Sequence, residues 1–192
     1  MIVAPTALSQ RHAEAVAEYF AATSHASELF FTQHANSIAT ACHAMSERFE
    51  RGGRLLVAGD GAQRSDVAHV VVEFLHPVVV GKRALPALAL AAVESGAANR
   101  SLDMMARSAD MLVVLTARST TDRAGELISS ARRLGLLTMM LAGAAAADRS
   151  DVDHLFAVPS SDACVVQETH EMLYHILWEL VHVFLDHRTV QR

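Results

Sequence analysis

The first quarter of the chain has a helical pattern of apolar positions. Between Ala7 and about Glu50, apolar residues recur at steps of three and four, as at Val16 and Phe20, and no glycine interrupts them. Thr23-Ser24-His25 supplies turn or capping chemistry in the middle of this stretch. The pattern therefore predicts two N-terminal helices that meet near residue 24.

After Gly52-Gly53 the pattern changes to short apolar runs, which are typical of buried strands. These runs are Leu55 to Ala58, Pro86 to Leu90, Met111 to Leu115, Leu137 to Leu141 and Leu155 to Val158. Helical stretches lie between or after them, at Ser65 to Leu75, Asp122 to Leu134 and Ala163 to Asp186. This alternation favours right-handed crossovers and a parallel sheet covered on both faces. The sequence therefore predicts a doubly wound α/β fold with five parallel strands.

Composition favours one domain over residues 1–192, because 192 residues with 52% hydrophobic content bury one sizeable core. The net charge is -5 and the 16 basic residues are scattered, which argues against nucleic acid or a membrane surface as a partner. Cys42 and Cys164 lie far apart, so we expect two reduced core thiols. With no signal-peptide pattern and no apolar run of about 18 residues, we expect a cytoplasmic protein.

Ligands of an open parallel sheet bind beyond the carboxyl ends of its strands, so chemistry is expected there. The turn from Gly59 to Ser65 opens a helix, where backbone N–H groups could hold an anion. A purely structural turn is an equal alternative. The loop from Thr116 to Arg123 offers hydroxyls and guanidinium groups that suit phosphate. Helix capping by Ser119, Thr120 or Thr121 explains the same hydroxyls.

Two helical segments carry polar residues inside apolar surroundings. His69 and Glu73 lie one turn apart on one helix face, where they can share a metal ion or a proton. Gln167, Glu171 and His175 form a stripe at steps of four along the last helix. A surface salt bridge or a capped core polar group is the alternative for the first pair. The solvated side of an amphipathic helix is the alternative for the stripe.

Three motifs resemble the sugar isomerase (SIS) domain family, and within it the phosphoheptose (sedoheptulose-7-phosphate) isomerases. They are the segment Gly52 to Gly61, the pair His69-x-x-x-Glu73, and the segment Gln167-Glu-Thr-His-Glu-Met-Leu-Tyr-His175. The resemblance extends from about Ala35 to Asp186. It implies a flavodoxin-like sheet and a homotetramer in which residues 1–50 form oligomerisation helices beside an α/β core of residues 51–192.

The same resemblance implies a zinc ion in each subunit, held by His69, Glu73, Gln167 and His175. Imidazole nitrogen and carboxylate oxygen are ordinary zinc ligands. The implied reaction interconverts a ketose and an aldose through an enediol, with Glu73 as the base and His175 as the acid. The implied partner is a small sugar or sugar phosphate.

The phosphate half of the motif set departs from the family. Asp60 replaces an asparagine, Gln63 replaces a phosphate-contacting serine, and the loop from Thr116 to Thr121 loses two hydroxyl positions and gains Arg118. Such changes indicate a different ligand. The expected substrate-binding residues are Asp60, Gly61, Gln63, Arg64, Thr116, Arg118, Ser119, Thr121 and Gln167.

The main alternative to an isomerase is a non-catalytic SIS module that senses a ligand or binds a protein, as a replication-initiator-associating protein does. Another metal-dependent activity, such as a lyase or hydrolase, is a third hypothesis.

Overall fold

The sheet is built from five apolar runs, and the three central runs are buried along their whole length. The structure is a computed structural model that describes residues 7–93, 95–117 and 122–190. The strands are β1 (Leu55–Gly59), β2 (Ala87–Ala89), β3 (Met111–Leu115), β4 (Leu137–Gly143) and β5 (His154–Val158). All neighbouring strands pair in parallel, in the order β2-β1-β3-β4-β5. The predicted doubly wound sheet is confirmed.

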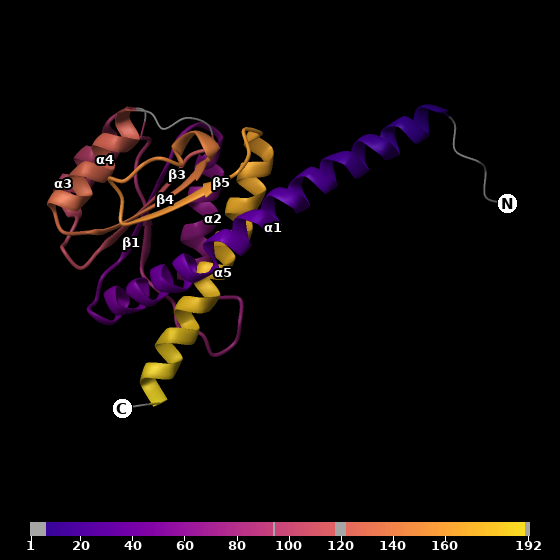
Figure 1. The fold of residues 1–192 in the computed structure, drawn as a ribbon. Helices are drawn as coiled ribbons and strands as arrows, with labels where there is room; N and C mark the ends of the chain where they lie inside the picture. The colour runs from indigo at the N-terminus through magenta and orange to yellow at the C-terminus, as the bar shows by residue number, and fades with distance from the viewer. Residues whose placement is uncertain (1–6, 94, 118–121, 191–192) are drawn as a thin grey trace.

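Helices cover both faces of this sheet (Figure 1). They are α1 (Ala7–Glu50), α2 (Arg64–Leu75), α3 (Ala97–Met105), α4 (Asp122–Arg133) and α5 (Ala163–Val190), with short 3₁₀ turns η1 (Gly61–Gln63) and η2 (Ala144–Ala146). Along β1, Leu55 and Val57 pack with α1, α2 and α5, whereas Leu56 and Ala58 pack with α3 and α4. Within the described residues no helix combines the length and apolar character needed to cross a membrane.

The prediction of two N-terminal helices is wrong, because α1 is one helix of 44 residues. Its interior holds neither glycine nor proline, the residues that interrupt helices most effectively. Thr23, at the expected turn, uses its hydroxyl to bond Glu168 Oε2 of α5 at 3.0 Å. The turn chemistry at this position therefore serves a tertiary contact.

Helix α3 was not predicted, because only Ala98 and Leu102 of its nine residues lie in the core. A single pair at a four-residue step is too short a pattern to identify a helix from sequence. Helix α3 packs with α4 on the sheet face opposite α2 and α5, so it contributes nothing to the site on those two helices.

Both cysteines are free thiols, as expected, but only one of them is in the core. Cys42 is buried in α1, and burial raises the pKa of its thiol to about 12. Cys164 is exposed. The prediction of two core thiols is wrong for Cys164, which lies in the first turn of α5, where its N–H bonds the Asp162 side chain.

Candidate functional site

Helix α2 carries the first half of the site. It follows β1 through the turn η1, so its first residues lie at the carboxyl end of the central strands. His69 and Glu73 share one face, and His69 Nε2 lies 3.4 Å from Glu73 Oε1. The Glu73 side chain is only 19% exposed. A carboxylate this buried requires a polar partner, and the imidazole supplies one.

Helix α5 brings His175 to the same point. His175 Nε2 lies 3.4 Å from His69 Nε2 and 3.9 Å from Glu73 Oε1. Two ring nitrogens facing each other at this distance need a proton or a cation between them, because two lone pairs would repel. The structure thus brings three of the four predicted metal ligands together from two helices.

The other edge of the His69 ring faces α5 as well. Tyr174 Oη lies 2.8 Å from His69 Nδ1, and Glu171 Oε1 lies 3.7 Å from the same nitrogen. Glu171, His69 and His175 offer ligand atoms within 4.8 Å of one another, so a second carboxylate borders the histidine pair. Glu171 belongs to the predicted polar stripe but was not assigned to the site. The sequence pattern predicts Tyr174 as a core residue of the last helix and not as a site residue.

The fourth predicted ligand, Gln167, contacts Asp66 rather than the histidines. Its Nε2 donates to Asp66 Oδ2 at 2.9 Å. Asp66 is buried, and desolvation raises its pKa above the ordinary value. This hydrogen bond uses the amide nitrogen of Gln167 and not its carbonyl oxygen. Gln167 as a ligand stays a prediction, and Asp66 is a residue that sequence reasoning missed.

The predicted phosphate half lies where β1 and β3 end. Thr116 donates to Asp60 Oδ2 at 3.2 Å, so the loops that follow these two strands are in contact. Gly61 has a φ of +47°, a conformation that favours glycine. A cavity of about 160 Å³ lies beside them, lined in part by Arg64 and Leu90. The predicted contacts of Arg118, Ser119 and Thr121 lie outside the described residues.

Gln63 occupies a more interior position than a substrate contact usually does. It is 1% exposed, and its Oε1 lies 3.3 Å from Nδ1 of the buried His170. Its Nε2 is buried and has no hydrogen-bond partner among the described residues. Substrate binding by Gln63 therefore stays a prediction.

Two other polar residues of α5 serve contacts away from the histidine pair. The Glu168 carboxylate accepts hydrogen bonds from Tyr19 at 2.7 Å and Thr23 at 3.0 Å, which fasten α1 to α5. His182 is buried and lies within hydrogen-bond distance of the carbonyl oxygens of Trp178 and Arg83.

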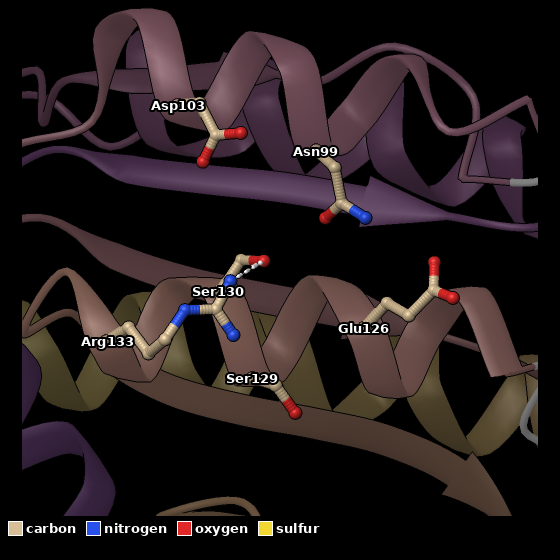
Figure 2. Close-up of a pocket in the computed structure, with 6 residues that line it drawn as sticks. All are labelled: Asn99, Asp103, Glu126, Ser129, Ser130 and Arg133. Atoms are coloured by element: carbon tan, nitrogen blue, oxygen red, sulfur yellow. Dashed lines mark hydrogen bonds between the residues drawn. The ribbon is translucent and has the colours of Figure 1, made fainter.

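A separate polar groove of about 450 Å³ runs between α3 and α4. Figure 2 shows Asn99 and Asp103 on one side of it and Glu126, Ser129, Ser130 and Arg133 on the other. It lies in the helix layer opposite α2 and α5 and contains none of the predicted site residues. The groove is therefore not the candidate active site.

The cluster of His69, Glu73 and His175 fits a zinc ion. Zinc with ligands at roughly 2.05 Å in tetrahedral geometry separates those ligands by about 3.4 Å. The three observed separations are 3.4, 3.4 and 3.9 Å, so a small local adjustment would complete such a site. Two imidazoles and a carboxylate leave room for one further ligand of a tetrahedral ion, which could be a protein oxygen or a substrate oxygen.

Comparisons with known proteins agree with this fold. No protein-family model matches the chain. The chain is 25% identical to a phosphoheptose isomerase from Maridesulfovibrio salexigens over 93% of each protein. It is 29% identical to one from Thermodesulfovibrio yellowstonii over 80% of this chain and 83% of the relative.

Solved structures give the same result for the fold. The structure of a phosphoheptose isomerase from Neisseria gonorrhoeae matches with a TM-score of 0.76 and 22% identity, covering 88% of this chain and 97% of that one. One from Francisella tularensis matches with a TM-score of 0.78 and 21% identity, covering 89% and 98%. The fold and site thus define an α/β protein with a five-stranded parallel sheet, which resembles the proteins of the SIS domain family. Within that class, the chain resembles the phosphoheptose isomerases over nearly its whole length.

Proposed function

We propose that the chain is a sugar-phosphate isomerase that interconverts a ketose and an aldose. The observation that carries the proposal is the convergence of His69 and Glu73 from α2 with His175 from α5. Similarity to phosphoheptose isomerases supports the same reaction class and favours an enzyme over a non-catalytic module.

Zinc is the proposed cofactor, one ion per subunit, held by His69, Glu73 and His175. Gln167 is the proposed fourth ligand, because Asp66 holds its amide nitrogen and leaves its oxygen for another partner. When bound, the ion supplies electrostatic stabilisation of negative charge on a substrate oxygen.

Acid and base roles are assigned by the resemblance and supported by the geometry. Glu73 would remove a proton from the carbon beside the carbonyl and return it to the neighbouring carbon. Glu73 Oε1 contacts both imidazoles, so Oε2 is the oxygen that would accept the proton. His175, which keeps a proton on Nδ1 when Nε2 holds the metal, would donate that proton to the carbonyl oxygen to give the enediol. It would then take the proton of the other enediol hydroxyl as the new carbonyl forms.

The proposed substrate is a sugar or sugar phosphate bound at the carboxyl ends of β1 and β3. Asp60 and Thr116 meet there, and Arg64 borders the adjacent cavity. A carboxylate at Asp60 disfavours a phosphate group placed directly beside it. We therefore propose that this half of the site is diverged and holds the distal end of the substrate differently from the phosphoheptose isomerases. Gly61, Gln63, Arg118, Ser119 and Thr121 complete the proposed substrate-binding set.

The assembly and location are also proposals. Exposed apolar side chains on the N-terminal part of α1, such as Val16 and Phe20, support a homotetramer formed through residues 1–50. Residues 51–192 would then form the α/β core of a single-domain cytoplasmic subunit.

The test is isomerase activity on a panel of ketose phosphates that includes sedoheptulose 7-phosphate. We expect Glu73→Gln to lower kcat by at least about 100-fold, because the base is removed while its shape is kept. Glu126→Gln, an exposed change on α4, is the matched control and should keep full activity. A wild-type protein that is inert on every substrate, or a Glu73→Gln variant as active as the control, would contradict the proposal.

Zinc is measured separately, on protein purified without chelators. The wild-type protein should hold about one equivalent, and His69→Ala and His175→Ala should hold little. Equal zinc in all three proteins would remove the metal from the proposal.

A further inference from the structure

The Nδ1 edge of His69 has a partner of its own. Tyr174 is 2% exposed, and its hydroxyl lies 2.8 Å from His69 Nδ1. The two rings also pack edge to face, with centroids 5.1 Å apart. The opposite edge, Nε2, faces Glu73 and His175. The two nitrogens of the His69 ring therefore have different partners: Nδ1 contacts Tyr174, and Nε2 contacts Glu73 and His175.

A tyrosine hydroxyl suits the Nδ1 position because it can either donate or accept a hydrogen bond. The phenol of a tyrosine is un-ionised at neutral pH, so Tyr174 offers acceptor lone pairs as well as its hydroxyl proton. A neutral phenol accepts a hydrogen bond from Nδ1–H, and this tautomer leaves the Nε2 lone pair free for a metal ion.

We propose that Tyr174 is a positioning residue that orients His69 so that Nε2, and not Nδ1, binds the metal ion. This inference rests on the proposed zinc site. In this arrangement Tyr174 bonds the ring nitrogen of His69 that does not bind the metal. His69 Nε2, His175 Nε2 and Glu73 would hold the metal ion. A Tyr174→Phe variant would keep the packing of the ring against His69 and lose the hydrogen bond to Nδ1.

The geometry also defines the competing arrangement. A metal ion at Nδ1 would use His69, Glu171 and His175, whose ligand atoms lie within 4.8 Å of one another. Such an ion would have to displace the Tyr174 hydroxyl from Nδ1. The two arrangements therefore make opposite predictions for Tyr174 and Glu171.

The test measures the zinc affinity of the full-length protein by competition with a chromogenic chelator. For Tyr174→Phe we expect the Kd for Zn²⁺ to rise by roughly 10- to 100-fold, the usual loss when the partner of a metal-bound histidine is removed. Glu171→Gln should change this Kd by less than about 3-fold. Tyr19→Phe removes the other tyrosine hydroxyl, which bonds Glu168, and Glu179→Gln changes an exposed α5 carboxylate, so both serve as controls. Melting of the metal-free proteins verifies that each variant is folded.

Nitrogen NMR of the zinc-loaded wild-type protein provides a readout that does not depend on any variant. We expect His69 to show a protonated Nδ1 and a metal-bound Nε2. The reverse pattern would overturn the inference, as would a Tyr174→Phe variant that binds Zn²⁺ as tightly as the wild type together with a Glu171→Gln variant that binds it weakly. Both of those results leave the proposed zinc enzyme standing, whereas a wild-type protein that binds no Zn²⁺ removes the zinc site and this inference together.

Discussion

The buried His170 shows how the fold selects the charge state of a side chain. Burial lowers the pKa of His170 to about 4, and a hydrogen bond to the Ala142 carbonyl opposes only part of that shift. The neutral ring has one N–H, which the Ala142 oxygen requires at Nε2 because a carbonyl can only accept. Nδ1 then needs a donor. Rotating the Gln63 amide by 180° would exchange its oxygen and nitrogen, so that Nε2, which is otherwise unpaired, would donate a hydrogen bond to His170 Nδ1.

This histidine makes stability depend on pH. Between about pH 4 and pH 6.5 the unfolded chain binds a proton at residue 170 and the folded chain does not, so the free energy of unfolding rises with pH and levels off above about 6.5. Lowering the pH from 7 to 5 therefore reduces the free energy of unfolding by about 2 kcal/mol through His170 alone. His34 and His154, whose pKa values burial also lowers, add losses of the same sign.

Urea unfolding at the two pH values measures the effect. His170→Gln should lose less stability than the wild type on acidification, by about 2 kcal/mol. The exposed His187→Asn is the control and should follow the wild type. An identical pH dependence in all three proteins would show that His170 is protonated equally in the folded and unfolded chains.

Site residues differ in how visible they are in the sequence. His69, Glu73 and His175 stand out because polar residues at helical spacing interrupt apolar runs. Asp66 and Tyr174 do not, because an aspartate near a helix start and an aromatic residue in a core helix are both ordinary there. Only the packing of α2 against α5 shows that Asp66 meets Gln167 and that Tyr174 meets His69.

At the scale of elements, all five strands were predicted, whereas one helix was divided in two and another was not predicted. Each of the five strands carries a short apolar run, and each predicted run overlaps an observed strand. Helix α1 was divided in error because Thr23 and Ser24 have the chemistry of a cap, which local sequence alone cannot distinguish from a hydroxyl used in a tertiary contact.

The continuity of α1 can be tested with proline. Ser24→Pro should lower the free energy of unfolding by about 3 kcal/mol, because proline in a helix interior removes a hydrogen bond and clashes with the carbonyl four residues earlier. Ser24→Ala should be neutral or slightly stabilising, since Ser24 is exposed. Chemical denaturation measures both. A proline variant as stable as the alanine variant would indicate a helix break at this position.

At the scale of the whole molecule, α1 extends well beyond the α/β body (Figure 1). Val16 and Phe20 on this extension are 69% and 71% exposed, an unfavourable arrangement for an isolated subunit. Covering these side chains with other copies of the chain is the proposed role of the extension.

The oligomer is tested by adding charge to this surface. Val16→Asp with Phe20→Asp should move the protein from the tetramer mass to smaller species in light scattering, because charges buried in an apolar interface are costly. Glu14→Gln with Glu18→Gln, at exposed positions of the same segment, is the control. A wild-type protein that is monomeric at micromolar concentration would contradict the proposed assembly.

His69 and His175 meet across a separation of 106 positions in the chain. A nascent polypeptide that has not yet produced its last segment lacks one of the two ring nitrogens, as well as the apolar surface that packs against α1 and α2. Loading with the proposed zinc ion would therefore have to wait for synthesis to finish, and a product of premature termination would lack the complete set of proposed ligands.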